Sequence, residues 1–334
     1  MFGFRREKRR AGPTPVPSSS VIRVEPRRSH GTAVALQGGG THGAFSWGVL
    51  DRLVEGGLHI DAICGVSSGS LLAVAYAQGA VRGGRDGARK EMRTLWRRAG
   101  TSHSFTPVME GLPGPWSWGW NLANNIAHHG AETMLRLFSP AQLNPLGFNP
   151  MRALVSSLLN PALLCHPEAP RVTISATDVE TGAPRFFCNE EITVDSLLAS
   201  CCLPFLFPPV EIGGRPYWDG AYSGNPPLAP LLRPYLPREL ILIRAQPSHR
   251  PGTPTKPDEI FNRLHEIACQ ASLDAELAAL PPDVPLIDYR ADATLLSLPL
   301  STKVSAEADM IAHLYAAGRA LVEKHQADAR AASA

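Results

Sequence analysis

One serine lies in a sequence context that is typical of a catalytic nucleophile. Residues 65–69 read GVSSG, which matches the G-x-S-x-G pattern that holds a serine, here Ser67, on a sharp turn between a strand and a helix. Residues 38–43 read GGGTHG, and their backbone N–H groups could receive the negative charge that develops on a carbonyl oxygen during acyl transfer. The two motifs predict a serine hydrolase, and the question they leave open is which base activates Ser67.

An aspartate far downstream is one candidate for that base. Asp219 begins the sequence DGA at residues 219–221 and follows a pattern that predicts a β-hairpin. In a two-residue site, Asp219 would both orient the serine hydroxyl and accept its proton. Because an unperturbed aspartate has a pKa of about 3.9, its surroundings would have to raise that pKa, and the apolar neighbours Tyr217 and Trp218 could contribute.

A histidine base is the second alternative, as in α/β-hydrolases with the chain order Ser, Asp, His. The candidates that follow Asp219 are His249, His265, His313 and His325. His249 lies in a proline-rich loop and the other three in predicted helices, whereas a triad histidine usually occupies a loop at the carboxyl edge of the sheet. The glycine run also precedes Ser67 too closely to leave room for the earlier strands of that fold.

The glycine run has a further interpretation, because Gly38, Gly40 and Gly43 also fit the G-x-G-x-x-G fingerprint of dinucleotide-binding folds. That fingerprint needs an acidic residue at the end of the next strand to bind the ribose. Asp61 lies instead near the start of the next strand, which ends directly before the G-x-S-x-G motif. The sequence therefore disfavours a dinucleotide site, and we expect no cofactor.

Short apolar strands alternate with helices along the chain, which predicts an α/β domain built from right-handed βαβ units. The apolar run at 31–38 predicts a buried strand that leads into the glycine run, and 60–64 predicts another directly before Ser67. Both motifs thus follow neighbouring strands. Further strands are expected at 171–177, 182–187, 205–212, 215–218, 239–245 and 284–290, and helices at 43–55, 68–78, 85–99, 194–202, 258–280 and 305–326.

Charge is distributed unevenly along the 334 residues. Residues 1–28 carry eight arginines and lysines against two glutamates, while the remainder is mildly acidic. With its prolines and serines, this composition predicts a flexible segment over 1–29, then one domain at 30–326 and a short flexible tail at 327–334. The basic segment is interpreted as a solubilising leader or as a contact with anionic lipid head groups. Nucleic acid is not expected, because no aromatic residues are interleaved with the charges.

Cysteine usage and hydropathy bear on the compartment. The sequence shows no secretory signal, no run of about 18 apolar residues and no CxxC spacing among its six cysteines. These features favour reduced thiols in the cytoplasm, with no metal site and with peripheral contact at the inner membrane surface as an option. Trp116, Trp118 and Trp120 lie in a stretch rich in proline and glycine, which is interpreted as a loop packed on the core or as one that faces lipid.

Four blocks, taken in order, resemble the patatin-like phospholipase family, in which G-G-G-x-R/K-G, G-x-S-x-G, a serine–proline block and D-G-G/A follow one another. Here the third block is SCCLP at 200–204, and the similarity extends over roughly residues 32–323. The resemblance implies a three-layer α/β fold with a central, mostly parallel sheet flanked by helices. It also implies a lipid acyl hydrolase. The residues at the family's motif positions are Gly38, Gly39, Gly40, His42, Gly43, Gly65, Ser67, Gly69, Asp219, Gly220 and Ala221.

By that resemblance, Ser67 is the nucleophile, Asp219 its base, and the glycine run the oxyanion hole. His42 departs from the family's Arg or Lys and would carry charge only when protonated. We therefore expect a weaker preference for anionic head groups or a different acyl substrate, unless His42 merely faces solvent at the start of a helix. The substrate is a phospholipid, a neutral lipid or a storage polyester. The alternative function is a lipid-binding scaffold without catalysis, which the presence of both Ser67 and Asp219 disfavours.

Overall fold

The computed structural model describes residues 27–28, 31–101, 140–143, 149, 151–204, 206–296, 298, 300–303 and 307–333. Most of the basic segment at 1–29 and the stretch that holds Trp116, Trp118 and Trp120 lie outside these residues. The expectations for both segments stay predictions.

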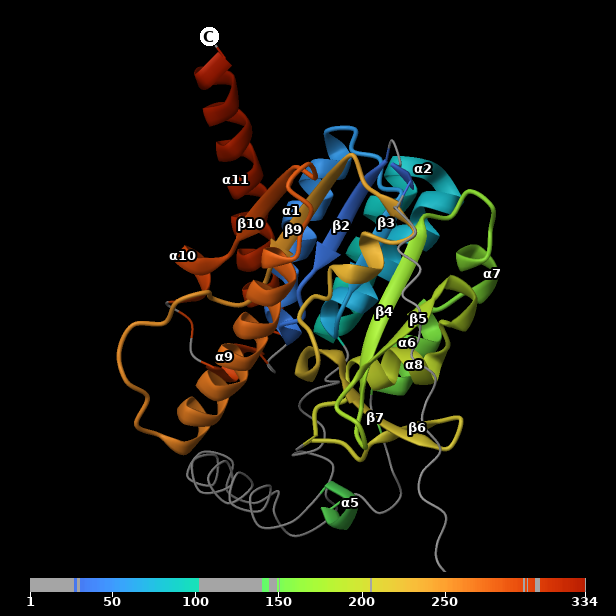
Figure 1. The fold of residues 1–334 in the computed structure, drawn as a ribbon, viewed down its shortest axis with the longest axis vertical. Helices are drawn as coiled ribbons and strands as arrows, with labels where there is room; N and C mark the ends of the chain where they lie inside the picture. The colour runs from blue at the N-terminus through green and yellow to red at the C-terminus, as the bar shows by residue number, and fades with distance from the viewer. Residues whose placement is uncertain are drawn as a thin grey trace, which may run out of the picture.

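A mixed sheet of eight strands forms the centre of the described fold (Figure 1). Its strands follow the order β10-β9-β2-β3-β4-β7-β6, and β5 also pairs with β4. All pairings from β10 to β4 are parallel, whereas those that involve β5, β6 or β7 are antiparallel. The strands span Thr32–Leu36 (β2), Ala62–Gly65 (β3), Arg171–Asp178 (β4), Pro184–Cys188 (β5), Val210–Ile212 (β6), Arg215–Asp219 (β7), Glu239–Arg244 (β9) and Leu286–Arg290 (β10).

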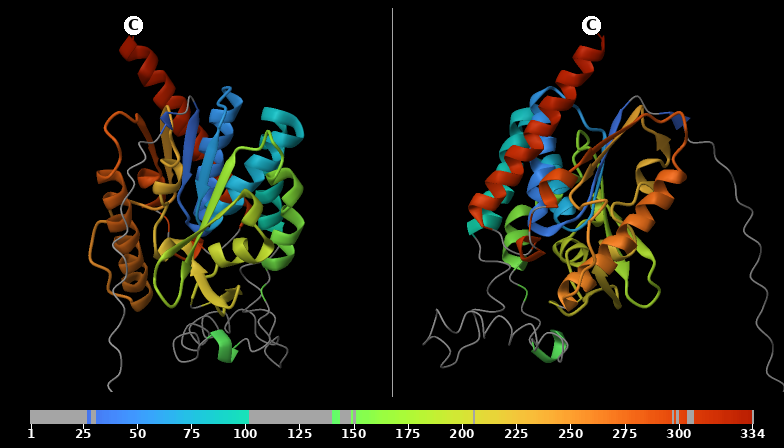
Figure 2. Two further views of the ribbon diagram at one scale, coloured as in Figure 1. Left: turned by 45° about the vertical axis from the view of Figure 1, so that its right-hand side comes forward. Right: turned by 90° about the vertical axis from the view of Figure 1, so that its left-hand side faces the viewer.

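Helices cover both faces of this sheet, giving the three-layer architecture (Figure 2). α1, α2 and α11 lie on one face, and α9 lies on the other. The α-helices span Gly43–Glu55 (α1), Ser68–Thr101 (α2), Pro140–Leu143 (α5), Met151–Leu158 (α6), Pro161–Leu164 (α7), Val194–Ser200 (α8), Pro257–Ala278 (α9), Asp292–Leu295 (α10) and Ala308–Ser333 (α11). Short 3-10 helices include Gly40–His42 (η1), Gly220–Tyr222 (η4), Ala229–Leu231 (η5) and Leu300–Lys303 (η6).

The central strands are buried on both faces, as their continuous apolar sequences predict. In β2, Val34 and Leu36 belong to the larger hydrophobic cluster with α1 and α2, whereas Ala33 and Ala35 belong to a second cluster that includes Leu273 of α9. This alternation follows from the two-residue period of a strand. The smaller side chains on the second face allow α9 and the short helix η5 to pack closely there.

The pairings of β4 bring two distant parts of the chain to one edge of that strand. β4 residues 173–174 pair with both β3 and β5, and residues 176–177 pair with both β5 and β7. Because a strand has only two edges, β3 and β7 must share one of them. Along that edge Gly65 pairs with Ile174, and Asp219 pairs with Ala176. The end of β3 and the end of β7 therefore lie about 7 Å apart along β4, given the rise per residue of a strand.

Several expected boundaries are wrong. The helices expected at 68–78 and 85–99 form one element, α2, in which only Gly83 and Gly84 leave helical geometry. α8 ends at Ser200 rather than at 202, and β6 begins at Val210 rather than at 205.

The two ends of the domain also differ from expectation. α11 continues to Ser333, so residues 327–333 of the expected flexible tail are helical. That stretch is rich in alanine and contains no glycine or proline, which favours continuation of the helix. At the other end, Arg27–Arg28 (β1) pair with Tyr235–Leu236 (β8) within the segment expected to be flexible.

Candidate active site

Ser67 lies on a strained turn between β3 and α2. Its φ of 54° is the only positive value recorded for a residue other than glycine in the described part of the chain. Two glycines make the turn compact: a Cβ on Gly65 would lie 2.3 Å from the carbonyl oxygen of Gly69, and a Cβ on Gly69 would lie 2.6 Å from that of Leu36. The G-x-S-x-G spacing thus brings the start of α2 directly against the end of β2 and β3 and presents Ser67 at the edge of the sheet.

The glycine run after β2 approaches Ser67 from one side. Gly40 has a φ of 58°, and a Cβ there would lie 2.2 Å from the carbonyl oxygen of Lys303, so both its conformation and its surroundings require glycine. The Gly39 N–H donates only a long hydrogen bond, 3.3 Å, to the hydroxyl of Ser68. Gly39 and Gly40 line the same cavity as Ser67.

Gly38 is engaged differently from the two glycines that follow it. Its N–H donates a 2.7 Å hydrogen bond to Oδ1 of Asn225, and its carbonyl accepts hydrogen bonds from Nδ2 of Asn225 and Nε2 of Gln246. Gln37 completes this network by donating to the Asn225 carbonyl and accepting from the Gln246 N–H. The peptide of Gly38 is therefore fixed by two amide side chains, which Gln37 in turn holds, and its N–H is already used, whereas Gly39 and Gly40 line the cavity.

Asp219 ends β7 and is 1% exposed. Its Oδ1 accepts a 2.9 Å hydrogen bond from the N–H of Ala221, and its own N–H donates to the carbonyl of Cys202 at 2.8 Å. Two residues earlier in the same block, the Ser200 hydroxyl accepts from the N–H of Ser67 at 3.1 Å. The segment 200–202 at the end of α8 thus contacts the backbone of both Ser67 and Asp219.

The surroundings of Asp219 make its carboxyl group harder to ionise. Burial is the main cause and raises its pKa from 3.8 to about 7. Hydrogen bonding by the Ala221 N–H and by the Ser67 side chain acts in the opposite direction but does not cancel the effect. A pKa near neutrality suits a general base, which must hold its proton weakly enough to return it.

His42 is buried rather than facing solvent, so that expectation is wrong. Its Nε2 lies 2.8 Å from the hydroxyl of Thr302. Burial, reinforced by the positive charges of Lys303 and Arg250, lowers the pKa of His42 to about 3. The imidazole is therefore neutral at physiological pH, and it supplies no cation where the family commonly has Arg or Lys.

Two cations from other parts of the chain act on this position. Lys303 of η6 lines the cavity, and its Nζ donates to Oδ1 of Asn262 at 2.7 Å and to Oε1 of Glu266 at 3.2 Å. Arg250 also binds Glu266, through two hydrogen bonds. These charges lower the pKa of Glu266 to about 2 although its burial acts in the opposite direction.

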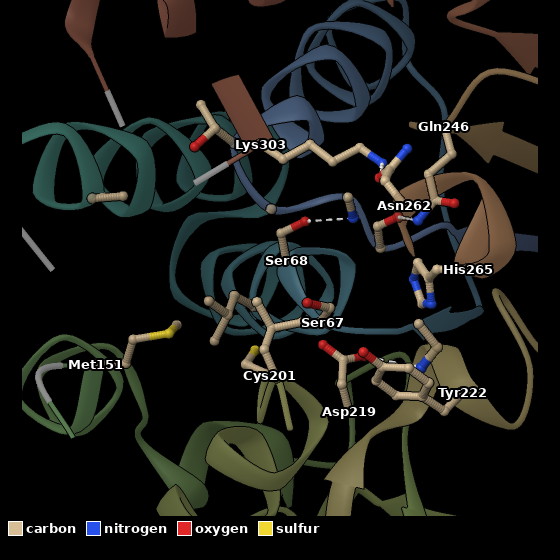
Figure 3. Close-up of a pocket in the computed structure, with 18 of the residues that line it drawn as sticks. Ser67, Ser68, Met151, Cys201, Asp219, Tyr222, Gln246, Asn262, His265 and Lys303 are labelled. Atoms are coloured by element: carbon tan, nitrogen blue, oxygen red, sulfur yellow. Dashed lines mark hydrogen bonds between the residues drawn. The ribbon is translucent and has the colours of Figure 1, made fainter. Parts of the chain in front are cut away.

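Ser67 and Asp219 line one cavity of about 280 Å³, whose two ends differ in chemistry. Figure 3 shows Met151 and Cys201 on one side of Ser67, and Gln246, Asn262 and Lys303 on another. The apolar end is lined from α2, α6 and the segment after α8 by Leu71, Leu95, Trp96, Ala99, Met151, Leu154, Cys201 and Leu203. The polar end is lined by Tyr222, Gln246, Asn262, His265 and Lys303.

The candidate triad histidines do not join Ser67 to Asp219. Of the four, only His265 lines the cavity; its Nε2 lies 3.5 Å from Sγ of Cys269, and its ring packs on Tyr222. Burial, reinforced by the charge of Lys303, lowers the pKa of His265 to about 4. In the described part of the chain no hydrogen bond links a histidine to Ser67 or Asp219.

The other motif positions have steric roles. A Cβ on Gly43 would lie 2.5 Å from the Ser68 hydroxyl, and one on Gly220 would lie 2.3 Å from the carbonyl oxygen of Ser175. Ala221 lines the cavity beside Asp219 and belongs to a small hydrophobic cluster with Val66 and Cys269. The absence of a side chain thus lets the start of α1 lie against Ser68 and lets the start of η4 lie against β4.

Sequence reasoning missed several residues that hold the site together. Asn225, Gln37 and Gln246 fix the glycine run, and Lys303 and Asn262 form the polar end. Gln37 directly precedes the glycine run and Asn225 lies shortly after the DGA motif, whereas Gln246, Asn262 and Lys303 are distant from every motif, and no spacing rule marks any of the five. Ser200 was found only as part of the serine–proline block.

Two properties of the described residues concern metal ions and membranes. These residues contain no group of three or more His, Cys, Asp or Glu side chains that could hold a metal ion. Nor does any helix formed by these residues combine the length and apolar character needed to cross a membrane.

A family model described as Patatin-like phospholipase matches residues 34–232. The chain belongs to this family. The matched range includes the glycine run, Ser67 and Asp219, and it ends before α9 and Lys303. Membership in the family supports lipid acyl hydrolase activity. A search of curated proteins finds no match.

Solved structures that are similar to this chain include VipD and ExoU. VipD from Legionella pneumophila gives a TM-score of 0.40 at 13% identity, covering 87% of this chain and 67% of VipD. The type III effector ExoU gives 0.33 at 16% identity, covering 90% of this chain and 53% of ExoU. ExoU in complex with SpcU, from Pseudomonas aeruginosa, gives 0.29 at 17% identity, with 90% and 61% covered. The length matched by this patatin-like chain is thus about half to two thirds of VipD and ExoU.

Proposed function

We propose that this protein hydrolyses carboxylic esters of phospholipids or related lipids through an acyl-serine intermediate on Ser67, with Asp219 as the only side-chain base. The observation that carries the proposal is the shared cavity in which a serine at positive φ lies beside a buried aspartate whose pKa is about 7. Such a pair needs no histidine, because the carboxylate itself is basic enough to take the serine proton.

In the first half of the reaction the Ser67 hydroxyl attacks the ester carbonyl carbon. The serine proton passes to the Asp219 carboxylate, and the carbonyl oxygen becomes an oxyanion that the N–H groups of Gly39 and Gly40 stabilise. The intermediate collapses when the C–O bond to the alcohol breaks, and the proton on Asp219 passes to that leaving oxygen. The acyl group stays on Ser67.

The second half regenerates the enzyme. Water enters the place of the departed alcohol, gives a proton to Asp219 and attacks the acyl carbon. A second oxyanion forms in the same position, then collapses to release the fatty acid, and Asp219 returns the proton to Ser67. The same residue thus acts as base and acid in turn, as its pKa near neutrality permits.

The two ends of the cavity supply an orientation for the substrate. The apolar end, lined from α2 and α6, suits an acyl chain, because burial of each CH₂ group contributes about 0.8 kcal/mol. The polar end, with Lys303 and Gln246, suits the alcohol part of the ester. This polarity favours a lipid with a hydrophilic head group over a wholly apolar triacylglycerol.

A panel of lipids analysed by mass spectrometry tests the proposal. Wild-type protein should release fatty acid from at least one phospholipid or lysophospholipid, and Ser67→Ala should release none. A fluorophosphonate should label wild-type protein on Ser67 and leave Ser67→Ala unlabelled. A folded wild-type protein that binds lipid but neither hydrolyses it nor reacts with the probe would instead be the non-catalytic scaffold.

A further inference from the structure

Exposed apolar side chains gather on one helix beside the cavity. Among the described residues, the large hydrophobic side chains with high exposure are Tyr222, Ile260, Phe261, Leu264, Ile267, Leu286 and Leu296. Four of these lie within two turns of α9, with exposed fractions between 42% and 61%. Leu264 is the most exposed of all, at 61%.

The spacing of these residues defines a stripe on the outer face of α9. Ile260, Leu264 and Ile267 are three or four residues apart and therefore lie on one side of the helix. The exposed Ala271 and Ala275 continue the same spacing towards the C-terminus of α9. We call these five residues the α9 stripe.

The opposite face of α9 is already packed against the domain. Cys269 and Leu273 are 1% and 0% exposed, and Cys269 donates to the carbonyl of Ala221 next to Asp219. Since the inner face supplies the contacts that hold the helix, the stripe is not needed for that purpose. An ordinary surface helix carries polar residues on its outer face, so an apolar outer face indicates a further contact.

One edge of the stripe opens onto the cavity. Phe261 is 45% exposed, adjoins Ile260 and Leu264, and also lines the cavity. His265 lines it one turn further on, and its ring packs at a tilt against that of Tyr222. Phe261 therefore joins the apolar α9 stripe to the polar end of the cavity that holds Ser67.

Two pairs of opposite charges lie beside the N-terminal half of the stripe. Lys256 lies 3.6 Å from Glu259, and Arg263 lies 3.5 Å from Glu266. Further along, α9 carries Asp274 and Glu276 and no arginine or lysine, so the surface offers no positive patch to an acidic partner. Its binding should be driven by burial of apolar side chains.

We propose that the α9 stripe is an interfacial docking surface that seats the protein on a lipid bilayer, so that substrate passes from the bilayer along Phe261 into the cavity. This inference rests on the proposed function, because only a lipid substrate needs such a path. A helix with an apolar face lies in the plane of the interface with that face among the upper acyl chains. The polar ends of the flanking side chains then stay in water.

Vesicle binding of an inactive protein tests the surface without relying on catalysis. In a Ser67→Ala background, the protein should sediment with vesicles of pure phosphatidylcholine. Adding Leu264→Asp and Ile267→Asp should weaken that binding by about tenfold or more, since both side chains would have to carry charge into the interface. The matched control is Leu286→Asp, which changes another exposed leucine, on β10, and should bind as the parent does.

Activity assays of the same substitutions in protein that retains Ser67 separate membrane docking from catalysis. The α9 pair should lose hydrolysis of bilayer phospholipid yet retain hydrolysis of a short-chain ester that dissolves as monomers. A milder pair, Leu264→Gln with Ile267→Gln, should fall between, which guards against misfolding of the aspartate variants.

The outcomes are distinct. Unchanged vesicle binding by the aspartate pair would overturn the docking surface, as would a dimer of the Ser67→Ala protein that dissociates in the pair, because the stripe would then bind a second copy. Vesicle binding that depends on the stripe, with no hydrolysis of any ester by the wild type, would leave the docking surface standing and refute the proposed function.

Discussion

Asp219 and His42 are both buried, and burial moves their pKa values in opposite directions. On the β7 side, loss of solvent raises the pKa of Asp219 to about 7. On the glycine-run side, loss of solvent lowers the pKa of His42 to about 3. In each case burial favours the neutral form. The same physical effect thus makes the Asp219 carboxylate a stronger base and the His42 imidazole a much weaker one.

The largest effect is expected from Asp219→Asn, which keeps the shape of the side chain but removes the base. We expect turnover of a lipid ester to fall by about 10²–10⁴-fold, the usual contribution of a general base. Steady-state kinetics on a short-chain ester would measure this. Asp51→Asn is the matched control, because Asp51 is equally buried but binds Arg89 and Arg319 away from the cavity. Near-normal turnover in folded Asp219→Asn would show that another group is the base.

The glycine run, which leads into His42, is tested by Gly40→Ala. A left-handed residue costs about 1–2 kcal/mol without glycine, and the new Cβ would meet the Lys303 carbonyl at 2.2 Å. Displacement of this loop should lower kcat by roughly 10²-fold, as loss of an oxyanion donor does.

Gly213→Ala separates strain from catalysis, because Gly213 has nearly the same φ, 59°, but no atom within 4 Å of the added Cβ. It should lose only the stability that the left-handed backbone costs, about 1–2 kcal/mol, and little activity. Equal activity losses in the two variants would mean that the loop around Gly40 has no special role.

The pH dependence of activity distinguishes an aspartate base from a histidine base. If the ionised form of Asp219 is the base, kcat/KM should fall about tenfold per unit as pH drops below about 7 and should level off above it. His42→Gln and His265→Gln should leave this inflection in place, because both histidines stay neutral down to about pH 4. An inflection that disappears in either variant would favour a histidine base.

Stability should respond to Asp219 in the opposite sense from activity. Since its pKa is higher in the folded state, the folded protein holds this proton more tightly, and stability is lost as pH rises from about 4 to about 7. Asp219→Asn should therefore melt a few degrees higher than wild type at pH 8. Asp51→Asn should melt lower, because Arg89 and Arg319 lower the pKa of Asp51 despite its burial. Calorimetry at pH 5 and pH 8 would show both signs.

The smallest effect is expected at His42. His42→Gln should change kcat/KM only a few-fold, since the neutral amide can still bind Thr302. His42→Arg should be worse, because it would bury a permanent charge beside Lys303. Improved stability of His42→Arg would contradict the buried, neutral state assigned to this position.

The sequence predicted the order of elements around the motifs because local pattern decides them. The limits of α1 were predicted to the residue, since Gly43 begins it and Gly56 follows its last turn. β5 and β7 were expected as hairpin strands, and they form. Boundaries failed at the end of α11, where no glycine or proline marks them, and within α2, where Gly83 and Gly84 do not end the element.

Much of the candidate site could not be predicted because it depends on contacts between distant segments. Nothing in the sequence around His42 shows that Thr302 and Lys303 will enclose it. The amide network of Asn225 and Gln246 around Gly38 spans nearly 190 and more than 200 residues of sequence, respectively. Burial of Asp219 follows from packing as a whole, which a local pattern does not record.

The shared edge of β4 determines where insertions and deletions can be tolerated. Because β3 and β7 both hydrogen-bond to that edge, the number of β4 residues between their pairing positions sets the distance between Ser67 and Asp219. A residue inserted between Ile174 and Ala176 would move Asp219 by about 3.3 Å and turn its side chain to the other face of the sheet. Insertions in the 179–183 turn would leave this spacing intact. Length variation among related chains should therefore accumulate in that turn and avoid the middle of β4.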